Sequence, residues 1–141
     1  MSRRATLKKY RSLQQNWEKI WQVLDRYDHE QLNQKPPSGG WSAMQVCAHL
    51  YLAETGSWRY VLKKRNADDL PNASLRSAWR SFVLNSYLRM PFKFKAPEGV
   101  GEQAMQDYYD PVEMKASWKK LRENMHSGLA EMDDRLFRKA I

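Results

Sequence analysis

Between Thr6 and Asp28, apolar side chains recur at steps of three and four residues, which predicts one face of a long amphipathic helix. The apolar positions in this stretch are Leu7, Tyr10, Leu13, Trp17, Ile20, Trp21 and Leu24. Residues 33–40, NQKPPSGG, contain two prolines and two glycines, and these residues end the helical pattern and indicate a loop. We therefore predict a helix over about residues 6–28, followed by a connection.

A second helix is predicted to start at Ser42. Ser42 and Gln45 have the spacing of a capping box, and Trp41 stands where a hydrophobic staple would pack on Val46. The apolar stripe that follows continues to the basic cluster at residues 63–65, which suits the negative end of the helix dipole. Its members are Val46, His49, Leu50, Ala53, Ser57, Tyr60 and Val61. Because His49 shares this face, we expect it to point into the interior of the protein.

The second half of the chain predicts two more helices, one shorter than the other. Apolar spacing indicates a helix at about residues 73–88, and the Pro- and Gly-rich residues 90–109 are predicted to be a long connection. Asp110, Pro111 and Glu113 form a strong start signal, with Asp110 as cap, Pro111 at the first helical position and Glu113 completing a box. The stripe after it is Met114, Trp118, Leu121, Met125, Leu129 and Met132, before a break at Asp133 and Asp134. This order of elements predicts an all-α helical bundle.

Composition restricts the class of protein but does not change the predicted fold. The 141 residues favour one domain with a real core, and 24 Lys plus Arg against 16 Asp plus Glu give a net charge of +8. Such a surplus suits nucleic acid, anionic lipid or an anionic small substrate. Cys47 is the only cysteine, which rules out an internal disulfide and favours a reducing compartment. With no transmembrane-length apolar run and no secretory signal pattern, we expect a cytoplasmic protein that does not bind membranes.

His49 is the residue with the most chemical potential, and two interpretations of it stay open. It is either a neutral core histidine that packs and hydrogen-bonds to a neighbour, or a metal ligand, since imidazole is a common ligand for divalent metals. A catalytic metal site needs about three protein ligands, so His49 alone does not define one. The chain contains neither an H-x-x-x-H nor an H-E-x-x-H pair.

The remaining candidates add little to His49. His29 stands in a polar context, and His126 falls in the series Lys119, Arg122, His126, which is predicted to be a polar flank. Cys47 lies two residues before His49, about 200° around a helix, so the two side chains cannot share a metal. Phosphate-binding glycine motifs and a nucleophile-elbow serine do not occur.

Basic residues form clusters that have a simple alternative explanation. They lie at residues 3–11, 59–65 and 76–95, and Phe92 and Phe94 alternate with lysines in the last of these. Charge combined with aromatic stacking suits single-stranded nucleic acid. No recognised nucleic-acid motif accompanies it, and a solvated basic face explains the same residues.

The segment HEQLNQKPPSGGWSAMQVCAHLYLAE, residues 29–54, resembles the DinB/YfiT-like superfamily of bacterial helical-bundle proteins. The resemblance rests on an L-N-x-x-P loop, then W-S-x-x-Q and a helix bearing H-L. In this chain those positions are Leu32, Asn33, Pro36, Trp41, Ser42, Gln45, His49 and Leu50, with Glu54 on the same helix. The later PFKFKAP segment and the acid-capped helix after residue 110 are also similar to this family.

The resemblance implies a DinB-like up-down four-helix bundle, often homodimeric, with a divalent metal, Zn or Ni, held by three histidines. His49 matches the first ligand. The family's other two ligands form an H-x-x-x-H pair on the last helix, and this chain lacks such a pair. We therefore expect one DinB-like domain over residues 1–141 that is incomplete at its C-terminus, with the final helix missing. Without that helix, Trp and Met side chains of the apolar stripes would face water.

Three functional hypotheses follow. The first is a DinB-like metal-dependent enzyme of the thiol-dependent transferase or hydrolase type, with a low-molecular-weight thiol or other small molecule as partner. The alternative is a non-catalytic helical module that acts through dimerisation or a partner protein. A nucleic-acid binder ranks third and is the least favoured of the three.

Overall fold

The computed structural model describes residues 2–65 and 105–138, and its regular structure in these ranges is entirely helical. In chain order the helices are α1 (Arg3–Leu24), α2 (His29–Asn33), α3 (Ala43–Lys64), α5 (Pro111–Glu131) and the short 3-10 helix η2 (Leu136–Arg138). The helix predicted at about residues 73–88 and most of the connection after it lie outside the described residues.

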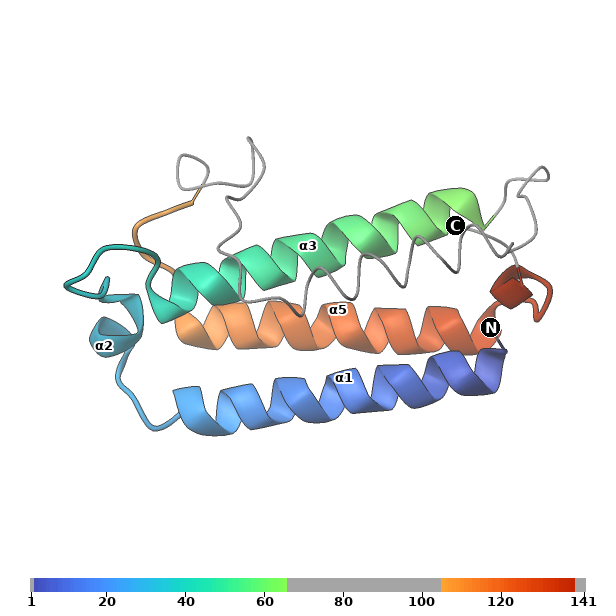
Figure 1. Ribbon diagram of the computed structural model, residues 1–141, viewed down its shortest axis with the longest axis horizontal. Helices are drawn as coiled ribbons and strands as arrows, with labels where there is room; N and C mark the ends of the chain where they lie inside the picture. Colours follow the sequence, from blue (N-terminus) through green and yellow to red (C-terminus); the bar gives the residue numbers. More distant parts are fainter. Residues whose placement is uncertain (1, 66–104, 139–141) are drawn as a thin grey trace.

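The three long helices lie side by side, with α5 between α1 and α3 (Figure 1). α3 and α5 run in the same direction and α1 runs opposite to both, while α2 packs against α3 at the end where α3 begins (Figure 1). No helix in the described ranges is long and apolar enough to cross a membrane. The all-helical bundle predicted from the sequence is therefore confirmed.

α1 differs from its prediction at both ends. It begins at Arg3, because the Ser2 hydroxyl accepts from the Ala5 N–H and caps the first turn. It ends at Leu24 rather than near Asp28, because Asp28 starts a new helix. Asp28 forms a capping box with Gln31, which satisfies backbone donors at the start of α2.

The start signals predicted for α3 and α5 are both found, with one correction. The Ser42–Gln45 capping box forms with both reciprocal hydrogen bonds, at 3.0 and 3.1 Å. At α5, the Asp110 carboxylate alone accepts from the N–H groups of Val112 and Glu113, at 2.8 and 3.1 Å. The capping box predicted with Glu113 is therefore wrong. Asp110 caps the helix, and the Glu113 side chain makes no return hydrogen bond to the Asp110 backbone.

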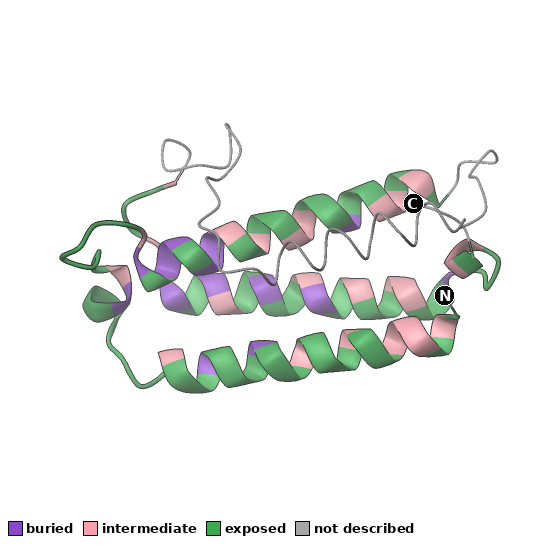
Figure 2. Cartoon of the chain, viewed as in Figure 1, coloured by how far each residue is buried: buried purple, intermediate pink, exposed green. Residues whose placement is uncertain are grey.

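The core centres on three indole rings from two helices. Trp17 and Trp21 of α1 meet the edge of Trp118 of α5, with each pair of ring centroids 6.4 Å apart and interplanar angles of 83° and 78°. Edge-to-face geometry of this kind is favourable beyond the buried area alone. Around the rings pack Leu32, Met44, Cys47, Ala48 and Met114. In Figure 2 the buried positions of α3 gather mostly in its first turns, close to α2.

Burial corrects two expectations about the apolar stripes. Leu13 and Ile20 belong to the predicted stripe of α1, yet they are 40% and 38% exposed, so the buried line of α1 is narrower than its pattern. Conversely, Trp17, Trp21, Trp118 and Met114 are all buried in the core. The expectation that these side chains would face water without a further helix is therefore wrong. The missing final helix itself stays a prediction.

Gly128 shows how closely α3 and α5 approach at the end far from α2. A Cβ atom at Gly128 would lie 2.4 Å from Cζ2 and 2.7 Å from Cη2 of the Trp58 ring. Trp58 is only 7% exposed, so its ring has little room to retreat. At Gly56, in the middle of α3, an added Cβ atom would lie in open space.

These two glycines provide a matched test of the packing. We expect Gly128→Ala to lower the free energy of unfolding by about 1–3 kcal/mol, because overpacking outweighs the gain in helix propensity. Gly56→Ala should raise it by about 0.5–1 kcal/mol through that gain alone. Urea unfolding followed by circular dichroism measures both. An equal rise for the two variants would contradict the close approach of Trp58 to Gly128.

Candidate functional site

His49 lies in the second turn of α3, and the segment before it fixes its position. The Ser42–Gln45 box holds the first turn, and Gln45 also donates to the Gln106 carbonyl at 3.0 Å. The Trp41 ring lies against the imidazole, with centroids 5.1 Å apart and planes at 48°. Trp41 therefore contacts His49, whereas the predicted staple partner Val46 is 43% exposed.

The face of α3 that carries His49 is not the face that packs into the core. The inner face consists of Met44, Cys47, Ala48, Tyr51 and Trp58, of which Tyr51 is partly buried and the others are buried. The predicted stripe of Val46, His49, Leu50, Ala53 and Tyr60 lies on the opposite side, about 180° around the axis. His49 therefore lies off the face of α3 that packs against α5, and its expected position in the interior of the bundle stays a prediction. α3 carries two apolar faces, and helical periodicity alone does not choose between them.

The imidazole of His49 is nonetheless partly buried. Its Nδ1 atom is buried and has no hydrogen-bond partner within the described part of the chain. Buried polar atoms in folded proteins nearly always have a partner, so an unpaired ring nitrogen calls for an explanation. The indole nitrogens of Trp17 and Trp21 are likewise buried without a partner, so this atom alone does not separate a packing histidine from a metal ligand.

The other histidines do not join His49. His29 is exposed at the first position of α2, and His126 is exposed on α5, where its ring lies 5.5 Å from that of Tyr10. Residues 2–65 and 105–138 contain no cluster of three or more His, Cys, Asp or Glu side chains with metal-binding geometry. His49 is therefore the single expected metal ligand that these ranges provide.

A buried polar cluster lies elsewhere, between α3 and α5. The Glu54 carboxylate accepts from the Trp118 indole N–H at 2.8 Å and from the Arg122 guanidinium, with which it forms an ion pair. Side chains of Arg122 and Glu54 are 4% and 19% exposed. From α1, the Tyr10 hydroxyl donates to the Arg122 carbonyl at 2.5 Å. Burial is the main cause that raises the pKa of Tyr10, which keeps this donor protonated.

The placement of Arg122 corrects the predicted polar flank of α5. Lys119 and His126 are exposed as expected. Arg122 is buried, with 3% of the whole residue exposed, and its side chain pairs with Glu54 of α3. Its Nε and Nη1 atoms are buried without partners among the described residues. The one signal in the sequence was Glu54, an acidic residue within an apolar helix, because a buried carboxylate requires a cationic partner.

Cys47 lies on the inner face and has no catalytic character. Burial raises the pKa of its thiol to about 11, so the thiol stays protonated at neutral pH. A protonated, buried thiol is neither a good nucleophile nor a metal ligand. This agrees with the expectation that Cys47 and His49 do not share a site.

The chain belongs to the DinB superfamily, whose family model matches residues 12–140. The all-helical bundle agrees with that membership, and the resemblance noted in the sequence is confirmed. Searches of curated proteins and of solved structures found no match. The fold and the family are thus established, and the chemistry rests on the chain's own residues.

The Glu54–Arg122 pair can be tested by a double-mutant cycle. We expect Arg122→Met and Glu54→Gln each to cost about 3 kcal/mol of unfolding free energy, because each leaves the partner buried without its counter-charge. The double variant should lose less than the sum of the two by about 1 kcal/mol or more. Urea denaturation of the four proteins gives the coupling, and strict additivity would contradict the pair.

Burial of Cys47 predicts both its reactivity and a pH effect. An aromatic disulfide reagent should label Cys47 only as fast as the protein unfolds, and immediately in denaturant. The thiol has a folded pKa of about 11 against an ordinary value of 9.0, so the unfolded chain ionises first. Its contribution to stability is therefore complete below pH 9.0 and is lost as the pH rises towards about 11. Rapid labelling of the folded protein would contradict this placement.

Proposed function

We propose that this protein is a DinB-type metal-dependent enzyme of the thiol-dependent transferase or hydrolase type, with His49 as one ligand of a divalent metal. The observation that carries the proposal is the buried, unpaired Nδ1 of His49 in a member of this superfamily. A metal ion is a partner that such a nitrogen accepts, and zinc or nickel suits an imidazole ligand.

His49 fits a ligand position, but a metal site requires further ligands. Since the ranges 2–65 and 105–138 provide no cluster of three donors, the proposal places the remaining ligands outside them.

The neighbours of His49 support a rigid ligand. The capping box fixes the first turn of α3, and the Trp41 ring restricts the imidazole on one side. A ligand held in place before the metal arrives loses little freedom on binding. When bound, the metal would act as a Lewis acid that makes a thiol or a water molecule nucleophilic at neutral pH.

The thiol, if one is used, has to come from outside the protein. Cys47 is the only cysteine of the chain, and it is buried on the inner face of α3 with a pKa of about 11. It can neither reach the side of α3 that carries His49 nor ionise there. A low-molecular-weight thiol as co-substrate is the remaining source.

The first test is the metal content of the purified, untagged chain by inductively coupled plasma mass spectrometry. We expect near-stoichiometric zinc or nickel in a product that carries the remaining ligands, with its intact mass measured alongside, and loss of that metal in His49→Ala. The substitution should cost little stability, because His49 lies off the inner face and makes no hydrogen bond within the described ranges.

His29→Ala is the matched control, since His29 is exposed at the start of α2. It should leave the metal content unchanged. Unchanged metal in His49→Ala together with a clear loss of stability would refute the ligand role and identify His49 as a packing residue. A metal-free wild-type protein would remove the enzyme proposal for this chain.

The second candidate is a non-catalytic helical module that dimerises or binds a partner helix. A specific observation favours it: Val46, Leu50 and Tyr60, on the side of α3 that carries His49, are 43%, 39% and 50% exposed. Exposed apolar faces of this kind often mark association surfaces. This candidate requires a metal-free protein with about twice the monomer mass, which light scattering on the same sample distinguishes from the first candidate.

A further inference from the structure

The first turns of α1 carry an unusual concentration of positive charge. Five cations occur within residues 3–11, and the first acidic residue of the chain is Glu18. We call this set the basic segment: Arg3, Arg4, Lys8, Lys9 and Arg11. It accounts for five of the 24 basic residues in a chain whose isoelectric point is about 9.7.

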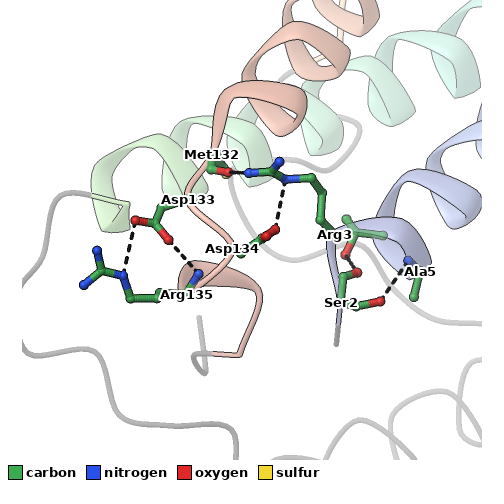
Figure 3. A network of polar contacts seen from close by, with 8 residues as sticks. Ser2, Arg3, Ala5, Met132, Asp133, Asp134 and Arg135 are labelled. Atoms are coloured by element: carbon green, nitrogen blue, oxygen red, sulfur yellow. Dashed lines mark hydrogen bonds and ion pairs between the residues drawn. The ribbon is translucent and has the colours of Figure 1, made fainter.

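The basic segment is fixed in place at its N-terminal end. Ser2 caps the helix, and the Arg3 side chain donates to the Met132 carbonyl and pairs with Asp134 at 3.1 Å (Figure 3). These contacts join the start of α1 to the turn that follows α5. The helix therefore presents its cations from a rigid support.

Arg4, Lys8 and Arg11 lie on one flank of this helix. Their spacing of four and three residues places them in a line about 10 Å long, and with Arg3 and Leu7 they line a hollow of about 520 Å³. All three side chains are exposed, and none has an ion pair or hydrogen bond within the described residues.

The two carboxylates next to the start of α1 do not neutralise this flank. Asp134 is paired with Arg3, and Asp133 is engaged by Arg135 through both its side chain and its backbone N–H (Figure 3). The pKa of Asp133 is lowered, chiefly because the Arg135 backbone N–H donates to it. Both acids next to the start of α1 therefore already have cationic partners.

Stability does not explain the arrangement. Cations at a helix N-terminus oppose the helix dipole, and like charges three or four residues apart repel, each by a few tenths of a kcal/mol. The first turn of α1 has no acidic residue to offset this. An anionic partner would turn the same charges into a favourable interaction.

We propose that the flank formed by Arg4, Lys8 and Arg11 binds the phosphate backbone of a nucleic acid. Clustered cations along one helix in a strongly basic domain are the electrostatic footprint of such binding. A bilayer surface fits less well, because the exposed apolar residues Leu13, Ile20 and Val23 of α1 lie on another flank. This binding surface goes beyond the proposed enzyme function and uses none of its residues. It also gives nucleic-acid binding more support than the sequence alone, which placed it third of three hypotheses.

The test is binding to fluorescently labelled DNA, single-stranded and duplex, by anisotropy between about 50 and 200 mM salt. The variant Arg4→Gln/Lys8→Gln/Arg11→Gln removes the flank. Its matched control, Arg26→Gln/Arg59→Gln/Lys63→Gln, removes the same charge from exposed positions on the turn after α1 and on α3. Circular dichroism confirms that both variants fold.

We expect wild-type affinity to fall steeply with salt, and the flank variant to bind at least about tenfold more weakly with a log–log salt slope smaller by about two to three. The control should change affinity by less than about threefold. Absence of DNA binding, or equal weakening in both variants, overturns the proposal. Binding to phosphatidylserine vesicles but not to DNA overturns it in favour of a membrane surface.

Discussion

Trp118 contacts both of the other long helices, and the packing of the bundle depends on it. Its ring meets Trp17 and Trp21 of α1 edge-on, and its indole N–H donates to Glu54 of α3. The apolar and polar contacts of one side chain thus fix α5 between its neighbours. Arg122, one turn later, completes the charge balance of Glu54, so the polar link is buried together with the core that surrounds it.

This arrangement explains why α3 has two faces with different roles. The inner face of α3 packs against α5. Small and medium side chains make this contact in its first turns, and Trp58 makes it beside Gly128 at the far end. His49 lies on the opposite side of α3, where the Trp41 ring packs against its imidazole. The ligand role proposed for His49 would therefore not compete with the packing of α3 against α5.

The electrostatics of the molecule are similarly divided. Glu54 and Arg122 form an ion pair inside the bundle, whereas five cations occur together on the first turns of α1. Surface charge of this kind governs association and leaves the fold unaffected. The two proposed functions, a metal site at His49 and a phosphate-binding flank on α1, therefore involve different helices, and separate variants can test each one independently.

The sequence by itself determined the helical class, the family and the local start signals, because caps and prolines act within a few residues: Ser42 with Gln45, and Asp110 before Pro111, are found as predicted. It did not determine which face of α3 is buried, nor that Arg122 leaves the polar flank to reach Glu54. Both depend on contacts between residues more than sixty positions apart. Periodicity identifies apolar and polar faces, but only the packing of α1, α3 and α5 decides which of them meets a partner.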